Sequence, residues 1–79
     1  MRLPRDVSGD DLIRALAKRG YRVTRQVGSH VRLSVITERG EHHVTVPRHD
    51  RLRVGTLAGA LQDVAAWLEI DRDDLIAEL

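Results

Sequence analysis

The spacing of the apolar residues changes twice along this chain, and that change most constrains its fold. Leu12, Ile13 and Leu16 recur with the period of an α-helix. Between residues 21 and 46, apolar and polar side chains alternate, as they do in half-buried β-strands. The helical period returns over residues 57–68. The pattern therefore predicts a helix, a strand region and a second helix, in that order.

The first helix has clear sequence signals at both ends. Ser8 is followed three residues later by Asp11, which is the pattern of an N-cap with an acid in the first turn. Gly20 occupies the position where a left-handed residue ends a helix. The sequence predicts a helix over residues 9–19.

Turn residues divide the alternating region into three strands. Gly28-Ser29 marks one turn and Arg39-Gly40 the next, and Pro47 ends the last run. Short turns between consecutive strands predict a three-stranded antiparallel meander.

Two further helices follow the strands. Thr56 is the expected N-cap of the second, and Asp71 and Asp74 are expected to cap a short last one. Helices on one face of an antiparallel sheet form an α+β sandwich, of order α-β-β-β-α with a short extra C-terminal helix. A chain of 79 residues is the size of one small domain, so we expect a single domain over residues 1–79.

Composition excludes several kinds of site. The chain has no Cys and no Phe, with one Trp and one Tyr. Disulfides, thiolate zinc sites and a cysteine nucleophile are therefore excluded, and stacking of several bases on aromatic rings is disfavoured. The first residues form no apolar run, and no segment is long and apolar enough for a membrane span. We expect a cytoplasmic protein that does not bind a membrane.

Charge is polarised along the chain. Residues 1–54 hold 12 Lys and Arg against 6 Asp and Glu, whereas residues 55–79 hold one Arg against six acids, which gives +6 and −5. The basic part favours a polyanionic partner, although an ordinary dipolar domain has the same pattern.

Strand alternation predicts which side chains leave the core. If Val31, Leu33 and Val35 face the helices, the polar residues between them face the other way. The predicted open face carries no hydrophobic residue and holds His30, Arg32, Ser34, Arg22, Thr24, Gln26, His43 and Thr45. Arg25 falls on the apolar side, where we expect it at a strand edge.

Histidine is the residue type best suited to chemistry on this face. His42 and His43 are adjacent and point to opposite faces, so they do not form a closed metal shell, and we expect no metal and no cofactor. His30 is a candidate acid or base, or a plain polar surface residue. Gly28 and Ser29 form either a simple tight turn or a backbone that approaches a phosphate. The 2′-OH of RNA can act as the nucleophile, so a protein that cleaves RNA needs neither a nucleophile nor a metal of its own. RNA is therefore the substrate that best fits the residues of this face.

Several blocks of the sequence together resemble the HicA-type (YcfA-like) toxins of bacterial toxin–antitoxin pairs. The blocks, in order, are Asp11-Leu12-Ile13, Gly20-Tyr21, Arg25-Gln26-Val27-Gly28-Ser29-His30, Val44-Thr45-Val46-Pro47-Arg48-His49 and Gly55-Thr56-Leu57. Val27 departs from the pattern, because members often have Lys or another polar residue there. Val31 departs too, because a second His or an aromatic residue is common after the catalytic His.

The resemblance implies a fold like the double-stranded-RNA-binding domain, cleavage of mRNA and neutralisation by a HicB-type antitoxin. It also implies that His30 is catalytic, as base toward the 2′-OH, as acid toward the leaving 5′-oxygen, or as both in turn. Arg22, Arg25 and Arg32 are candidates for phosphate contacts, with a solvated basic face as the alternative. Two other functions stay open, namely a non-catalytic RNA-binding module and a protein-interaction domain that docks an acidic partner.

Overall fold

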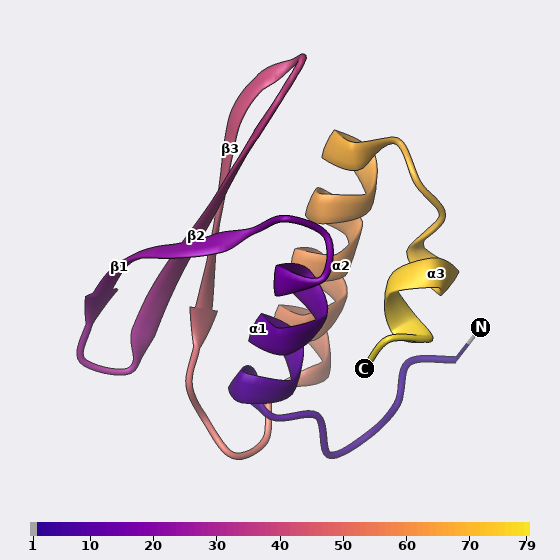
Figure 1. Ribbon diagram of the computed structural model, residues 1–79. Helices are drawn as coiled ribbons and strands as arrows, with labels where there is room; N and C mark the ends of the chain where they lie inside the picture. The colour runs from indigo at the N-terminus through magenta and orange to yellow at the C-terminus, as the bar shows by residue number, and fades with distance from the viewer. Residues whose placement is uncertain (1) are drawn as a thin grey trace.

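The computed structural model describes residues 2–79 and has the predicted order α1-β1-β2-β3-α2-α3. The elements are α1 (Gly9–Ala17), β1 (Arg22–Val27), β2 (His30–Thr37), β3 (Gly40–Pro47), α2 (Val54–Leu68) and α3 (Arg72–Ile76). The strands form one antiparallel sheet in the order β1-β2-β3. Figure 1 shows α1 and α2 on one face of this sheet and α3 on the far side of them. The predicted α+β architecture is confirmed, and no helix of residues 2–79 lies on the other face of the sheet.

Helix α1 begins with the predicted cap. The backbone N–H of Asp11 donates to Ser8 Oγ at 3.0 Å, and the backbone N–H of Ser8 donates to Asp11 Oδ2 at 3.0 Å. The backbone N–H of Ser8, and after it the Ser8 hydroxyl, hold the pKa of Asp11 below its usual range, because hydrogen bonds to the carboxylate favour its ionised form. The helix ends at Ala17, two residues earlier than predicted, and Gly20 takes the expected positive φ of 96°.

The expected N-cap of α2 at Thr56 is wrong by three residues. The helix begins at Val54, and Arg53 is its N-cap without a side-chain hydrogen bond. Leu52 is buried and its N–H donates to Val7 O at 2.7 Å, so the chain is already anchored just before this helix. Asp71 is the N-cap of α3 as predicted, but its side chain forms no cap bond. None of the helices within residues 2–79 is long and apolar enough to cross a bilayer.

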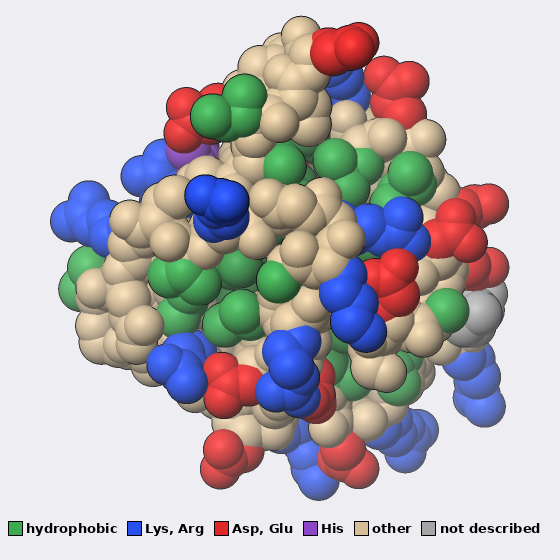
Figure 2. All heavy atoms as spheres, viewed as in Figure 1, with side chains coloured by type: hydrophobic (Ala, Val, Ile, Leu, Met, Phe, Trp, Pro, Cys, Tyr) green, Lys and Arg blue, Asp and Glu red, His purple; other side chains and the backbone are tan. Residues whose placement is uncertain are grey.

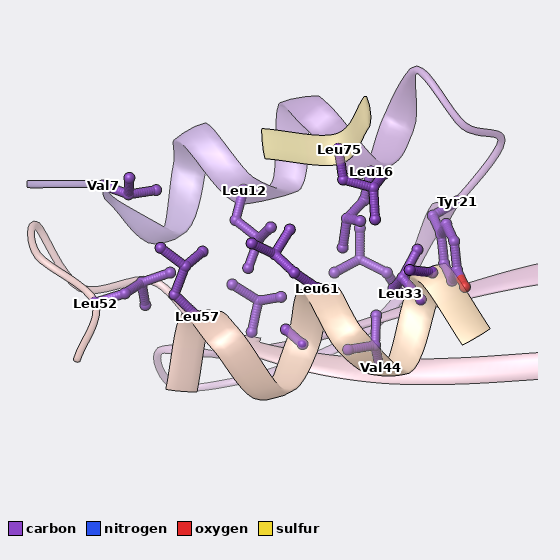
Figure 3. Close-up of a cluster of buried hydrophobic side chains, with 14 of the residues drawn as sticks. Val7, Leu12, Leu16, Tyr21, Leu33, Val44, Leu52, Leu57, Leu61 and Leu75 are labelled. Carbon is purple, nitrogen blue, oxygen red and sulfur yellow. The ribbon is translucent and has the colours of Figure 1, made fainter. Parts of the chain in front are cut away.

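The core lies between the sheet and the helices α1 and α2 and is almost entirely aliphatic. Figure 3 shows side chains from the two helices and the sheet pointing toward one another. The fully buried residues of the core include Leu12, Leu16, Tyr21, Val31, Leu33, Val46, Leu57, Leu61, Val64 and Leu75. Burial of Val31, Leu33 and Val35 confirms which face of β2 meets the helices.

Candidate functional site

His30 is placed by the turn that joins β1 to β2. Val27 and His30 are the closing pair of this two-residue turn. Gly28 has φ +58°, whereas Ser29 is not in the positive-φ region, and this combination is that of a type II′ turn. The positive φ of Gly28 favours glycine at this position. A Cβ there would meet nothing within 4 Å, so the outer side of the turn is open.

The turn is fixed to the loop that follows β3. The N–H of Arg48 donates to Ser29 O at 2.6 Å, and the Arg48 guanidinium contacts the Asp10 carboxylate at 2.9 Å (Nε–Oδ1). Gly9 packs so closely that a Cβ there would lie 2.2 Å from Pro47 O. The turn that precedes His30 is therefore tied, through Arg48, to the first turn of α1.

A bulge in β1 changes which side chains share a face. The pairing runs Val23↔Leu33 and then Arg25↔Arg32, so one extra residue, Thr24, lies between them. Residues after the bulge have the opposite orientation to that expected from strict alternation.

Three predictions for β1 are therefore wrong. Arg25 pairs with Arg32 and lies on the open face, whereas Gln26 pairs with the buried Val31 and lies on the other side. Val27, expected in the core, pairs with His30 and is 62% exposed. The expectation that the open face carries no hydrophobic residue also fails, because Val27 and Ile36 both lie on it.

The open face consists of rows of three residues across the sheet. From the turn outward, the rows are Val27-His30-Pro47, Arg25-Arg32-Thr45 and Arg22-Ser34-His43, followed by the pair Ile36-Glu41. The sequence placed His30, Arg22 and Arg32 on this face correctly. Figure 2 shows Lys and Arg side chains at the left margin of the molecule, over the strands.

The three arginines of this face have no acidic partners among residues 2–79. Arg22, Arg25 and Arg32 are exposed and form no ion pair or hydrogen bond through their side chains within residues 2–79. Five other arginines each pair with a carboxylate, namely Arg14, Arg19, Arg39, Arg48 and Arg51. The positive charge of the three strand arginines is therefore available to an external anion.

The His30 side chain is also without a partner. It is exposed and forms no hydrogen bond within the described chain. By contrast, His42 lies on the helix side of the sheet, where Nδ1 is 2.7 Å from Tyr21 Oη and the ring stacks on Trp67. The prediction that His42 and His43 face opposite sides is confirmed.

One polar cluster of the open face was not foreseen. Ser34 was predicted to be on this face, but it is only 7% exposed because Thr24 and His43 lie over it. Strand alternation assigns a face and gives no information about which neighbours cover a residue. Within residues 2–79, no three His, Asp or Glu side chains gather as a set of metal ligands.

A family model of the HicA toxin of bacterial toxin–antitoxin systems matches residues 9–65. The matched part runs from the start of α1 into α2 and includes the whole sheet with His30. Comparisons with curated proteins and with solved structures find no match. The chain therefore belongs to the HicA family, the toxins of bacterial toxin–antitoxin systems.

Proposed function

We propose that this toxin is a metal-independent endoribonuclease that cleaves mRNA in the cytoplasm, with His30 as its catalytic residue and a HicB-type antitoxin as its inhibitor. The observation that carries the proposal is the unpartnered, exposed imidazole of His30 on a face with three unpaired arginines. A free imidazole near neutral pH can both accept and release a proton. The family membership supports a toxin role for that chemistry.

The reaction uses the RNA's own nucleophile. His30 accepts the proton of a 2′-OH as the 2′-oxygen attacks the adjacent phosphorus, and the P–O5′ bond breaks. The leaving 5′-oxygen takes a proton from the imidazolium so formed or from water. The products are a 2′,3′-cyclic phosphate and a 5′-OH, and the atoms balance without a metal-bound water.

The residues around His30 have separate roles in this proposal. Arg25 and Arg32 form the adjacent row and stabilise charge on the phosphate, while Arg22 binds the RNA farther along the face. Gly28 and Ser29 bring the backbone of the turn close to the RNA, because nothing covers the outer side of Gly28.

The antitoxin is proposed to cover this same face. It would present acidic side chains to Arg22, Arg32 and His30, because charge complementarity is the means by which such a surface is recognised. A complex in which this face stays open would contradict masking of the site by the antitoxin, though not the toxin assignment.

Expression in bacterial cells tests the proposal. Wild type should arrest growth and degrade mRNA, whereas His30→Ala should do neither at equal protein level. If both proteins are harmless and leave mRNA intact, the RNA-binding module without catalysis is the better account. If both are equally toxic, the chemistry does not depend on His30.

A further inference from the structure

The rows of the open face repeat at a regular distance along β2. His30, Arg32 and Ser34 are the central members of three successive rows. Two residues of a strand span about 6.6 Å, so the first and third rows are about 13 Å apart. This repeat is comparable to the separation of successive phosphates along a nucleic-acid strand. A single RNA strand running along β2 would therefore meet one row at each phosphate.

The third row contains a fixed histidine on β3 and an unpaired arginine on β1, with Ser34 of β2 between them. His43 Nδ1 lies 2.6 Å from Ser34 Oγ, and His43 Nε2 lies 3.3 Å from Glu41 Oε1. Ser34 Oγ lies 2.8 Å from Thr24 Oγ1, which donates to Arg32 O at 3.4 Å. The ring of His43 is thus held at both nitrogens.

This chain of hydrogen bonds accepts a charged imidazole without leaving a donor unpaired. Nδ1–H can donate to Ser34 Oγ, the Ser34 hydroxyl to Thr24 Oγ1, and the Thr24 hydroxyl to the Arg32 carbonyl. The Arg32 carbonyl can only accept a hydrogen bond, so the series of hydrogen bonds ends there. The other ring N–H faces Glu41, so the imidazolium offsets the charge of this acid and leaves Arg22 as the cation of the row that a phosphate can bind.

We propose that Arg22 and His43, supported by Ser34 and Thr24, form a phosphate subsite for the RNA two phosphates away from the one at His30. The inference rests on the proposed function, because it takes the open face to be the RNA-binding face. It adds the path of the strand along β2 and a role for His43. The path ends after this row, because the next pair is the exposed Ile36 and the acidic Glu41.

The test measures binding of 2′-O-methyl oligonucleotides, which have no free 2′-OH, as a function of length. Fluorescence anisotropy with oligonucleotides of two to eight nucleotides would give the affinity gained with each added phosphate. Wild type should gain affinity up to the third phosphate of the path. In His43→Gln and in Arg22→Gln, the affinity gained with the third phosphate should be about three- to tenfold smaller than in wild type. The affinity gained with the first and second phosphates should be unchanged. Arg72→Gln removes the same charge from α3, on the far side of the helices, and should follow wild type.

The charged groups around His43 are Glu41, Arg22 and Arg32. Variants that keep or remove the ring separate a phosphate contact from a structural role. A thermal melt reports whether the variants are folded, and Ser34→Ala frees the ring while it keeps the imidazole. If Ser34→Ala binds like wild type, Ser34 does not hold the ring for binding.

Each outcome distinguishes this inference from the proposed function. If folded His43→Gln and Arg22→Gln show the wild-type gains at every length, the third-row subsite is wrong while RNA binding stands. If wild type binds no oligonucleotide, the open face is not the RNA-binding face and both proposals fall. If wild type binds with the expected steps but cleaves no RNA, the subsite stands and the catalytic proposal fails.

Discussion

At the scale of single residues, the three histidines of the strands differ by what surrounds them. His42 is held by Tyr21 and stacks on Trp67, and His43 is held by Ser34 and faces Glu41. The side chain of His30 has no partner among residues 2–79, on a face rich in arginine. An imidazole without a resident partner is free to exchange a proton with a substrate, and His30 shares its face with the unpaired arginines, which is why we propose His30 as the catalytic residue.

Gly9 is the residue at which a single methyl group should be most disruptive. A Cβ there would lie 2.2 Å from Pro47 O and 2.8 Å from Arg48 Cα, both in the backbone. Gly9→Ala should therefore lower the free energy of unfolding by about 2–3 kcal/mol, because the backbone must move. Urea denaturation is the measurement.

Gly59 provides the control for this prediction. It lies within α2, and a Cβ there meets nothing within 4 Å. Gly59→Ala should raise the free energy of unfolding by about 0.5–1 kcal/mol, as alanine does in a helix. Equal effects of the two substitutions would contradict the close packing of α1 on Pro47.

Tyr21 should make the fold sensitive to alkali. Burial, with a smaller effect of the Asp63 carboxylate, raises the pKa of Tyr21 to about 12. The unfolded phenol ionises near its usual value of 10.0, so the unfolded state loses this proton first. The free energy of unfolding should therefore be unaffected by Tyr21 below pH 10 and should fall between pH 10 and 12.

Phenolate absorbance checks this prediction directly, because the chain has one Tyr. Tyr21→Phe should remove most of the loss of stability between pH 10 and 12, although it also loses the hydrogen bond to His42. A folded-state titration of Tyr21 near pH 10 would show that burial does not act as described.

At the scale of elements, the turn between β2 and β3 is fastened to the end of α2. Arg39 Nη1 donates to Ala66 O at 3.1 Å and to Trp67 O at 2.7 Å, and its guanidinium lies 4.5 Å from the Trp67 ring centroid. Carbonyls at the end of a helix lack partners within the helix, so Arg39 acts as its C-terminal cap.

Arg39→Ala should lower the free energy of unfolding by about 1 kcal/mol, since the side chain is half exposed and part of its interaction is replaced by water. Arg39→Lys keeps the charge but loses the planar contact with the ring, and should recover only part of the loss. The fluorescence of Trp67, the one Trp of the chain, reports the change directly. A variant as stable as wild type, with unchanged emission, would mean that the turn does not hold α2.

The elements themselves could be predicted from the sequence because their signals are local. Apolar period, the Ser8–Asp11 cap and the turn glycines gave the order of helices and strands, and alternation placed His30 and Arg32 on the open face. The bulge at Thr24 could not be predicted, because it depends on how β1 pairs with β2. The bulge therefore places Arg25, Gln26 and Val27 on the faces of the sheet opposite to those predicted. The start of α2 was missed as well, and just before it the chain is held by a tertiary hydrogen bond from Leu52 to Val7 that has no local sequence signal.

At the scale of the whole molecule, the two halves of the chain place opposite charges on different layers. The unpaired arginines of β1 and β2 lie on the sheet, while the acids of residues 55–79 lie on and after α2. The net charge of +1 therefore understates the positive charge of the open face. A polyanion would approach the sheet side first.

RNA binding should consequently weaken steeply with salt. If Arg22, Arg25 and Arg32 each contact one phosphate, the slope of log K against log salt should be about −2 for single-stranded RNA. Replacing all three by Gln should bring the slope close to zero in anisotropy titrations between about 50 and 200 mM salt. A flat response of the wild type would count against phosphate recognition by this face.

The most direct test of the account is cleavage of a defined RNA by the purified protein in the presence of EDTA. Wild type should cut the RNA to a 2′,3′-cyclic phosphate and a 5′-OH, and one 2′-deoxy substitution at the cut should block the reaction. His30→Ala, shown to be folded, should be slower by about 10²–10⁴-fold, as expected for loss of a general acid–base. Cleavage by His30→Ala at the wild-type rate, or cleavage of the 2′-deoxy substrate at the same position, would contradict the account.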